Sequence, residues 1–237
     1  NHIEWKNDKA QRTAKDAFDR LFNMKWLPAG RGLWAMGSPI VMDDNNSAPL
    51  QSCAFVSTEN SVVEAMTFLF DASMLGVGVG FDADGAGRFY VSPPSNETRT
   101  FVIPDSREGW VESLKLLLEA YLKPAQSPGI VNTPTNIPVP VFDYSEIRPY
   151  GEPIKRFGGK ASGPGPLKKM HELIQKILER RSGSTITMTD IADIGNIIGT
   201  CVVAGNVLRC LPSGTMVHLT NGLTPIENVR VGDIVET

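Results

Sequence analysis

The sequence pattern changes at residue 210. Up to residue 209, stretches with helical spacing of apolar residues alternate with short apolar runs typical of buried strands. Over 210–237, short strand-like runs are separated by turn residues, and no helical stretch lies between them. The first pattern predicts a mixed α/β domain over 1–209, and the second predicts a separate β-rich segment over 210–237.

Within 1–209, five helices are expected from apolar residues that share one face. Two of them are expected at 9–23 and 166–181. The other three are a helix capped by Ser61, a helix that begins within 105–108, and a helix that is capped by Asp190 and ends at residue 198. Strands are predicted at 51–56, 74–81 and 201–208. No regular element is expected at 27–37, 88–103 and 147–166.

The strand predicted at 74–81 has glycine at every second position, at Gly76, Gly78 and Gly80. One face of this strand therefore carries no side chains, so a ligand or another backbone can approach closely. The spacing differs from the dinucleotide-binding and P-loop patterns, and residues 82–85 are not followed by the glutamate that completes a calcium loop. The glycines favour either close packing or a site lined by backbone.

The three cysteines, Cys53, Cys201 and Cys210, are too few and too widely spaced for a disulfide framework or a zinc site. On the residues alone, Cys53 is either an inert thiol or a redox-active or nucleophilic one, whereas Cys201 is expected to be structural because its surroundings are apolar. No metal site is predicted, because the three histidines have no partner histidine at helical spacing.

Composition excludes several classes of partner. Lys and Arg number 23 against 26 Asp and Glu, and the resulting net charge of −3 argues against nucleic-acid binding. No signal peptide and no apolar run of about 20 residues is present, so a cytoplasmic protein without membrane contact is expected. The chain starts at Asn1 and stops at Thr237 directly after a strand-like run, so a fragment is expected.

The sequence from Cys210 onward resembles the start of an intein, a self-splicing domain of the Hint fold. The resemblance rests on Cys-Leu-Pro-Ser-Gly-Thr at 210–215 and on Ile-Glu at 226–227 and Gly-Asp at 232–233. It implies that the Cys210 thiol attacks the carbonyl of Arg209 and converts that peptide bond into a thioester. The downstream Thr-x-x-His motif and terminal Asn of inteins cannot be placed in this chain.

Residues 1–209 resemble the amino-terminal part of the adenosylcobalamin-dependent ribonucleoside-triphosphate reductases. Seven stretches carry the resemblance in the expected order: 27–34, 52–56, 75–81, 143–149, 151–155, 157–164 and 201–207. The family implies part of a ten-stranded α/β barrel, with an insertion at 82–142 that supplies an effector pocket. It also implies adenosylcobalamin as the cofactor, which generates a thiyl radical on a cysteine expected beyond this chain.

The same resemblance assigns roles to individual residues. Cys53 would be one of two redox-active cysteines that reduce a ribonucleoside triphosphate, with a thioredoxin-like protein as reductant. The substrate would contact Ser52, Gly76, Gly78 and Gly80. A deoxynucleotide effector would contact Asp143, Ser145, Arg148 and Lys155.

Three alternatives remain open at this point. The first is a diphosphate-reducing ribonucleotide reductase of the cobalamin or di-iron class, against which the long insertion after Phe81 argues. The second is a splicing domain as the main functional unit, and the third is a non-catalytic nucleotide-binding module. On the reductase hypothesis this chain alone is expected to turn over no substrate, because it lacks the radical cysteine and the second redox cysteine.

Overall fold

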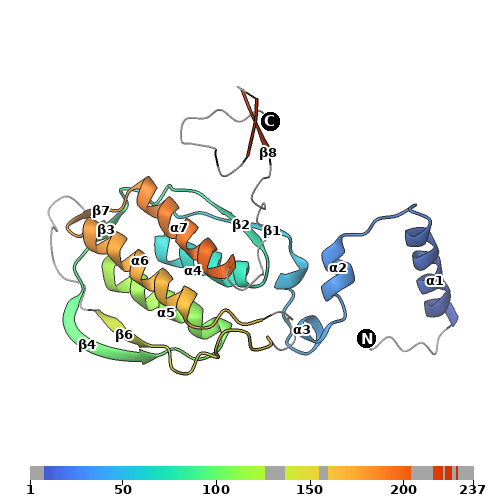
Figure 1. Ribbon diagram of the computed structural model, residues 1–237, viewed down its shortest axis with the longest axis horizontal. Helices are drawn as coiled ribbons and strands as arrows, with labels where there is room; N and C mark the ends of the chain where they lie inside the picture. The colour runs from blue at the N-terminus through green and yellow to red at the C-terminus, as the bar shows by residue number, and fades with distance from the viewer. Residues whose placement is uncertain are drawn as a thin grey trace.

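Four helices pack side by side and form the body of the molecule, in a computed structural model that describes residues 8–125, 137–154, 160–203, 216–220, 222–225 and 228. These helices are α4 (Val62–Met74), α5 (Arg107–Tyr121), α6 (Gly165–Arg181) and α7 (Met188–Val203). Three shorter segments precede them along the chain: α2 (Gly30–Ala35), α3 (Pro39–Met42) and the 3-10 helix η1 (Ala48–Leu50). Helix α1 (Asp8–Phe22) lies apart from the body (Figure 1).

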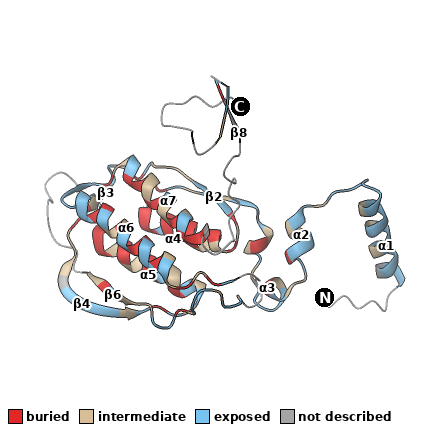
Figure 2. Ribbon diagram, viewed as in Figure 1, coloured by how far each residue is buried: buried red, intermediate tan, exposed pale blue. Residues whose placement is uncertain are grey.

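The core lies where the four helices face one another, as the buried stripes in Figure 2 show. Its fully buried side chains come from all four helices and include Met66, Phe70, Leu114, Leu118, Ile174, Leu178 and Ile194. Full burial of one such side chain stabilises the fold by about 1.5–3 kcal/mol. The helices therefore hold in place the strands that pack against them.

The strands form small sheets at the edges of this body. Strands β1 (Cys53–Val56) and β2 (Gly78–Phe81) pair in parallel, as do β4 (Ser95–Val102) and β6 (Pro138–Asp143). Strand β3 (Phe89–Val91) pairs antiparallel with both β5 (Leu122–Pro124) and β7 (Ser184–Thr185). Strands β8 (Met216–Leu219) and β9 (Gly222–Pro225) form a separate hairpin. The described residues thus have a mixed α/β fold, as predicted, and they do not form a complete barrel, of which only a part was expected.

Two of the predicted helix caps are confirmed. The Ser61 hydroxyl accepts a hydrogen bond from the Glu64 N–H at 3.1 Å, and the Ser106 hydroxyl accepts one from the Gly109 N–H at 3.0 Å. Each serine satisfies one of the N–H groups that the first helical turn leaves without a partner. Helices α1 and α6 also lie close to their predicted bounds.

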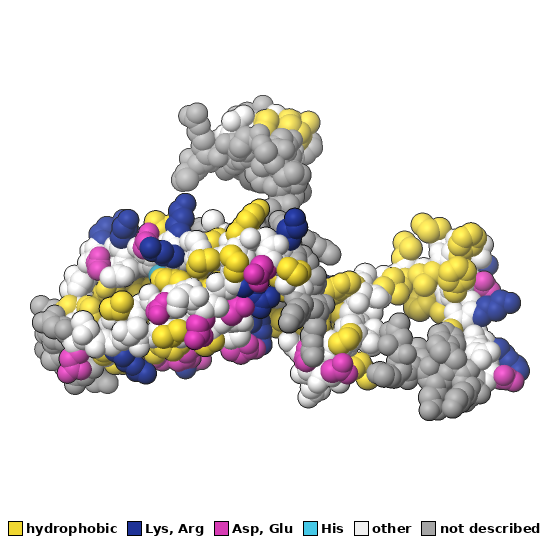
Figure 3. All heavy atoms as spheres, turned by 60° about the horizontal axis from the view of Figure 1, so that its bottom comes forward, with side chains coloured by type: hydrophobic (Ala, Val, Ile, Leu, Met, Phe, Trp, Pro, Cys, Tyr) yellow, Lys and Arg dark blue, Asp and Glu magenta, His cyan; other side chains and the backbone are white. Residues whose placement is uncertain are grey.

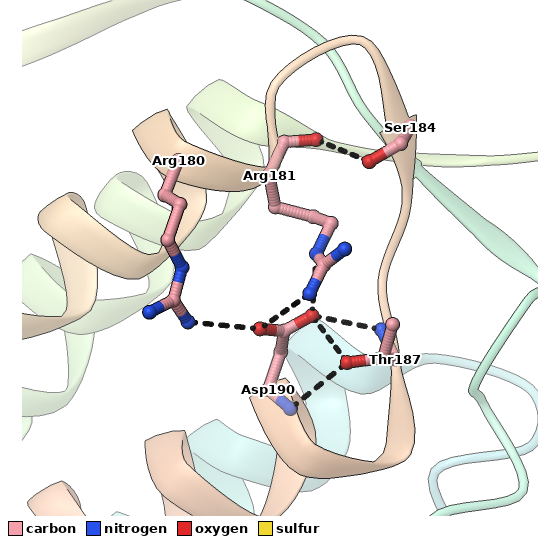
Figure 4. Close-up of polar contacts among 5 residues, drawn as sticks. All are labelled: Arg180, Arg181, Ser184, Thr187 and Asp190. Carbon is pink, nitrogen blue, oxygen red and sulfur yellow. Dashed lines mark hydrogen bonds and ion pairs between the residues drawn. The ribbon is translucent and has the colours of Figure 1, made fainter.

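The predicted cap at Asp190 is wrong in detail. Thr187 precedes α7 and caps it: its hydroxyl accepts from the Asp190 N–H at 3.2 Å, and the Asp190 carboxylate accepts from the Thr187 N–H at 3.0 Å. The same carboxylate, only 1% exposed, is also held by Arg181 at 2.7 Å and by Arg180 at 3.4 Å (Figure 4). Asp190 thereby ties the end of α6 to the start of α7.

Three other sequence predictions are also wrong. Residues 30–35 form α2, and Pro28 does not prevent this because it lies before the helix and removes none of its hydrogen bonds. Residues 88–103 contain β3 and β4, whose partners lie far away in the sequence. Helix α7 continues through Val203 where a strand was expected at 201–208, because its buried residues Ile194, Ile198, Cys201 and Val202 share a helical face. Residues 204–208 lie outside the described part.

A buried polar cluster links β6 and the residue that follows it to α5 and α6. The His171 ring stacks on Phe142 with centroids 4.4 Å apart, its Nε2 lies 3.1 Å from the Ser113 hydroxyl and its Nδ1 lies 2.9 Å from the Tyr144 hydroxyl. Ser113 donates its own proton to the carbonyl of Trp110, so it accepts from Nε2–H, and Tyr144 donates to Nδ1. Burial lowers the pKa of His171 to about 3, so this neutral tautomer persists at ordinary pH.

The amino-terminal region differs from the body in its exposed apolar surface. Figure 3 shows hydrophobic side chains gathered there. The exposed large side chains of this region are Phe18, Phe22, Met24, Trp26, Leu27, Leu33, Trp34, Met36 and Met42. None of the described helices has both the length and the apolar character that a membrane span needs.

Candidate active site

Strands β1 and β2 present one open face. Cys53 and Phe55 of β1 lie opposite Gly78 and Gly80 of β2, and all four residues are exposed. Register partners on adjacent parallel strands point to the same side of the sheet, so the Cys53 thiol stands beside a strand that has no side chains on that face. The structure therefore brings together Cys53, Gly78 and Gly80, as expected.

The space beside Gly78 and Gly80 is large enough for a methyl group but not much larger. A methyl group at Gly78 would lie 3.5 Å from the carbonyl oxygen of Ser52, and one at Gly80 would lie 3.6 Å from the Phe55 ring. Both distances are ordinary contacts, so packing alone does not require glycine at either position. Phe55 was not singled out from the sequence, although its place two residues after Cys53 puts it on the same face.

Gly76 does not belong to the strand, contrary to the prediction. It has a positive φ of 80° and ends α4: its N–H donates to Ser73 at 2.8 Å, and the N–H of Val77 donates to Ala72 at 3.1 Å. This is a Schellman motif, in which the left-handed residue is usually glycine. Ser52 lies directly before β1, and its carbonyl accepts the Gly78 N–H at 2.9 Å.

The far ends of β1 and β2 are joined through Thr58 and Asp82. The Asp82 carboxylate accepts from both the N–H and the hydroxyl of buried Thr58 at 2.8 Å, and the same hydroxyl accepts from the Gly85 N–H at 2.9 Å. Hydrogen bonds from the Thr58 backbone and from Ser57 lower the pKa of Asp82 to about 2. In the sequence, Asp82 stood out only as the first residue of a stretch that resembles a calcium-binding loop but lacks the glutamate that completes one.

The residues predicted to contact an effector lie at the end of β6 and just after it. Asp143 accepts a hydrogen bond from the Ser145 N–H at 2.9 Å, which lowers the pKa of Asp143. Arg148 donates to Asp105 at 2.7 Å, and this partner 43 residues away was not predicted. Lys155 lies outside the described residues.

A cavity of about 780 Å³ adjoins Arg148. Its walls include the ion pairs Arg148–Asp105 and Arg107–Asp71 as well as Ala48 and Leu75, which precede β1 and β2 along the chain. Cys53, Gly78 and Gly80 are not part of these walls. The structure therefore places the two predicted sites apart, with this cavity reaching from one set of elements toward the other.

The other predicted residues lie outside the Cys53 and Arg148 sites, although Cys201 lines the 780 Å³ cavity. Cys201 is buried in α7, and burial raises the pKa of its thiol to about 12, in keeping with a structural role. Arg209 and Cys210 lie outside the described residues, whereas the β8–β9 hairpin that follows them is described. Within the described ranges, no group of three or more His, Cys, Asp or Glu side chains is placed to hold a metal ion.

Comparisons with known proteins relate this chain to ribonucleotide reductases. Residues 79–178 match the insertion domain of B12-dependent ribonucleotide reductase, and residues 1–38 match the ribonucleotide reductase alpha domain. The adenosylcobalamin-dependent ribonucleoside-triphosphate reductase of Euglena gracilis is 50% identical over 88% of this chain and 28% of its own length. A probable enzyme of the same name from Dictyostelium discoideum is 42% identical over 86% of this chain and 28% of its own length.

The fold agrees with the sequence comparison. A crystal structure of a B12-dependent, class II ribonucleotide reductase superposes with a TM-score of 0.64 and 27% identity, over 82% of this chain and 33% of that one. The chain thus spans only about a third of the length of the proteins that it matches.

Proposed function

This chain is a homologue, over about a third of their length, of the adenosylcobalamin-dependent ribonucleoside-triphosphate reductases, and we propose that it is the amino-terminal part of such an enzyme. The complete enzyme would reduce ribonucleoside triphosphates to 2′-deoxyribonucleoside triphosphates in the cytoplasm. A diphosphate-reducing enzyme is the alternative, and the triphosphate form is favoured because the Euglena and Dictyostelium relatives are named as ribonucleoside-triphosphate reductases.

The observation that carries the proposal is the exposed Cys53 thiol beside Gly78. In the proposed reaction the substrate loses its 2′-hydroxyl as water and gains a hydrogen in its place. The two electrons come from Cys53 and a second cysteine beyond this chain, which form a disulfide, and a thioredoxin-like dithiol then reduces that disulfide. A thiol with this role must be accessible to substrate and to reductant, as Cys53 is.

The other residues near Cys53 would position the nucleotide. We assign substrate contact to Ser52, Gly78 and Gly80, whose open face lets a ribose lie against backbone. Gly76 would act indirectly, because it shapes the turn that leads into β2. A radical-forming cysteine would lie beyond this chain.

Adenosylcobalamin would supply the radical that starts the reaction. The described residues offer no site that fits it, because the charged walls of the 780 Å³ cavity are already paired with one another. Among the described residues, the three buried side-chain polar atoms that lack a hydrogen-bond partner, on Arg31, Ser38 and Tyr90, also lie outside these walls. No step through the cofactor is therefore assigned to this chain.

We assign effector contact to Asp143, Ser145, Arg148 and Lys155, within the insertion-domain match. Arg148 is already paired with Asp105, so an effector phosphate would have to compete with this carboxylate. Binding of a deoxynucleotide that changes when Arg148 is replaced would support the assignment. Binding that is insensitive to Arg148 and to the stretch 151–155 would favour a different nucleotide site.

The test of the proposed function uses the full-length reductase. Deoxyribonucleotide formation from a ribonucleoside triphosphate is measured with adenosylcobalamin and a dithiol reductant. We expect the wild-type enzyme to turn over many times and Cys53→Ser to stop after at most one turnover while it still binds nucleotide. Multiple turnover by Cys53→Ser at the wild-type rate would mean that Cys53 is an inert thiol. Turnover by the 237-residue chain alone would contradict the proposal that the active site also needs cysteines beyond this chain.

We also propose that residues 210–237 begin an intein that interrupts the reductase, with 1–209 as the flanking part. The motif at 210–215 and the helix-free hairpin β8–β9 support this. Cys210→Ala in the complete precursor should abolish ligation of the flanks after Arg209, and normal ligation would overturn the assignment.

A further inference from the structure

Arg31 of α2 contacts the segments that lead into both strands of the candidate site. Its guanidinium donates to the carbonyl of Pro49 at 3.3 Å and to the carbonyl of Gly76. Pro49 lies in η1, four residues before Cys53, and Gly76 lies two residues before Gly78. One side chain thus joins the chain ahead of β1 to the chain ahead of β2.

The β1–β2 pair is therefore held at both ends. Arg31 holds the ends at which the strands begin, and the Asp82 carboxylate with Thr58 holds the ends at which they finish. Between these two attachments the pair has only four residues per strand, and no third strand joins it within the described parts of the chain. A two-stranded sheet of this length is not stable by itself, so its geometry depends on the core that packs behind it and on what holds its ends.

The contacts of Arg31 are unusual for a charged side chain. Both of its acceptors are backbone carbonyls, its Nε is buried without a hydrogen-bond partner, and it forms no ion pair with any carboxylate in the described ranges. A surface arginine that served only solubility would keep its Nε in water. The planar guanidinium offers two donors at fixed spacing, which the single ammonium of lysine cannot reproduce.

We propose that Arg31 is a positioning residue for the Cys53 site: by bonding the carbonyls of Pro49 and Gly76 together, it sets the register and separation of Cys53 and Gly78. This inference rests on the proposed function for its consequence in catalysis, but the positioning itself does not depend on that function. A positioning role for Arg31 also gives a function to the stretch 27–34, which resembles the reductases but contains no residue of the predicted site.

The first experiment measures amide hydrogen exchange in the full-length reductase. Arg31→Lys should speed exchange of the Gly78 N–H, which donates to Ser52, at least tenfold, and should leave β4–β6 unchanged. Arg20→Lys is the matched control, because Arg20 pairs with Asp16 on exposed α1 and should have no effect on Gly78. Unchanged exchange at Gly78 would overturn the proposal. So would loss of protection throughout the chain, because the effect would then not be local.

The second experiment measures turnover by the full-length reductase. Arg31→Lys should lower kcat/KM for the ribonucleotide at least tenfold while the dissociation constant of the effector stays the same. An inactive wild-type enzyme would contradict the proposed function, yet the exchange experiment would still decide the role of Arg31. If Arg31→Lys has the wild-type kcat/KM but faster exchange at Gly78, catalysis does not depend on how firmly β1 and β2 are held. This result would overturn the proposed effect of Arg31 on catalysis.

Discussion

Cys53 and Gly78 lie directly opposite each other on neighbouring parallel strands, and the chain between them forms α4. This is a βαβ arrangement in which the helix packs behind the strands, since the other face of the pair carries Val79 and Phe81 toward the core. The exposed face is therefore the one on which the thiol stands. Its most distinctive property is the room that Gly78 leaves next to Cys53.

Gly78→Ala should separate folding from substrate binding. The added methyl group would meet the Ser52 carbonyl at an ordinary 3.5 Å, and φ at Gly78 is not positive, so the free energy of unfolding should change by less than about 1 kcal/mol. If the ribose lies against this strand, KM for the ribonucleotide should rise about tenfold. Steady-state kinetics of the full-length enzyme and urea unfolding measure the two effects.

The control for this substitution is Gly30→Ala, because a methyl group there meets nothing within 4 Å. It should leave both KM and stability close to their wild-type values. A Gly78→Ala enzyme with wild-type KM would mean that the bare strand serves packing and not the substrate.

Gly195→Ala in α7 should destabilise the chain. Its methyl group would overlap the ring of Phe81, with Cε1 only 2.7 Å away, and that ring packs against the core. Overpacking of this kind costs about 1–3 kcal/mol. Gly199→Ala, one turn further along the same helix, meets nothing within 4 Å and should instead stabilise the helix by up to about 1 kcal/mol. Urea midpoints of the two variants should therefore move in opposite directions, and equal midpoints would contradict the close packing of α7 on β2.

The sequence predicted the parts of this fold that depend on local interactions. The caps at Ser61 and Ser106 and the helices they begin follow from hydrogen bonds within one turn. Strands β3 and β4 were missed because their partners are distant, and the end of α7 was mistaken for a strand because a short apolar run fits both periods. For the candidate sites, the resemblance to the reductases predicted roles for Cys53 and Arg148. The contacts of Arg31 with Gly76 and of Arg148 with Asp105 span 45 and 43 residues, and no local pattern reports them.

Asp190→Ala should destabilise the fold by about 3 kcal/mol at pH 7. The substitution leaves the Arg181 guanidinium and the Thr187 N–H without their buried acceptor. Arg180→Gln is the control: its side chain is 65% exposed, so its contact with Asp190 should contribute less than about 1 kcal/mol. Chemical unfolding of both variants measures the difference.

The contribution of Asp190 should also depend on pH in a defined direction. Burial would raise the pKa of Asp190, but hydrogen bonds from Thr187 and Arg181 outweigh burial and lower it. A lowered pKa means that the stabilisation is complete above the usual carboxyl pKa, about 3.9, and is lost as the pH falls below it. The gap in unfolding free energy between wild type and Asp190→Ala should therefore shrink between pH 5 and pH 2.5, and a gap that stays constant would contradict this ionisation.

His171 should make the chain less stable at mildly acidic pH. Burial lowers its pKa in the folded state to about 3, whereas in the unfolded chain it titrates near its usual 6.5. Below about pH 6 the unfolded chain therefore binds a proton that the folded chain does not, and the free energy of unfolding should fall by about 1.4 kcal/mol per pH unit from this group. In His171→Gln, the dependence of the unfolding free energy on pH between pH 6 and pH 4.5 should become weaker by the contribution of this one proton, about 1.4 kcal/mol per pH unit. Urea unfolding at several pH values measures this dependence.

Tyr144→Phe is the matched control for His171→Gln. It removes one hydrogen bond, which contributes about 1 kcal/mol, but it keeps the imidazole and therefore the same dependence on pH. Equal slopes in wild type and His171→Gln would mean that the folded chain accepts a charged His171 between Ser113 and Tyr144.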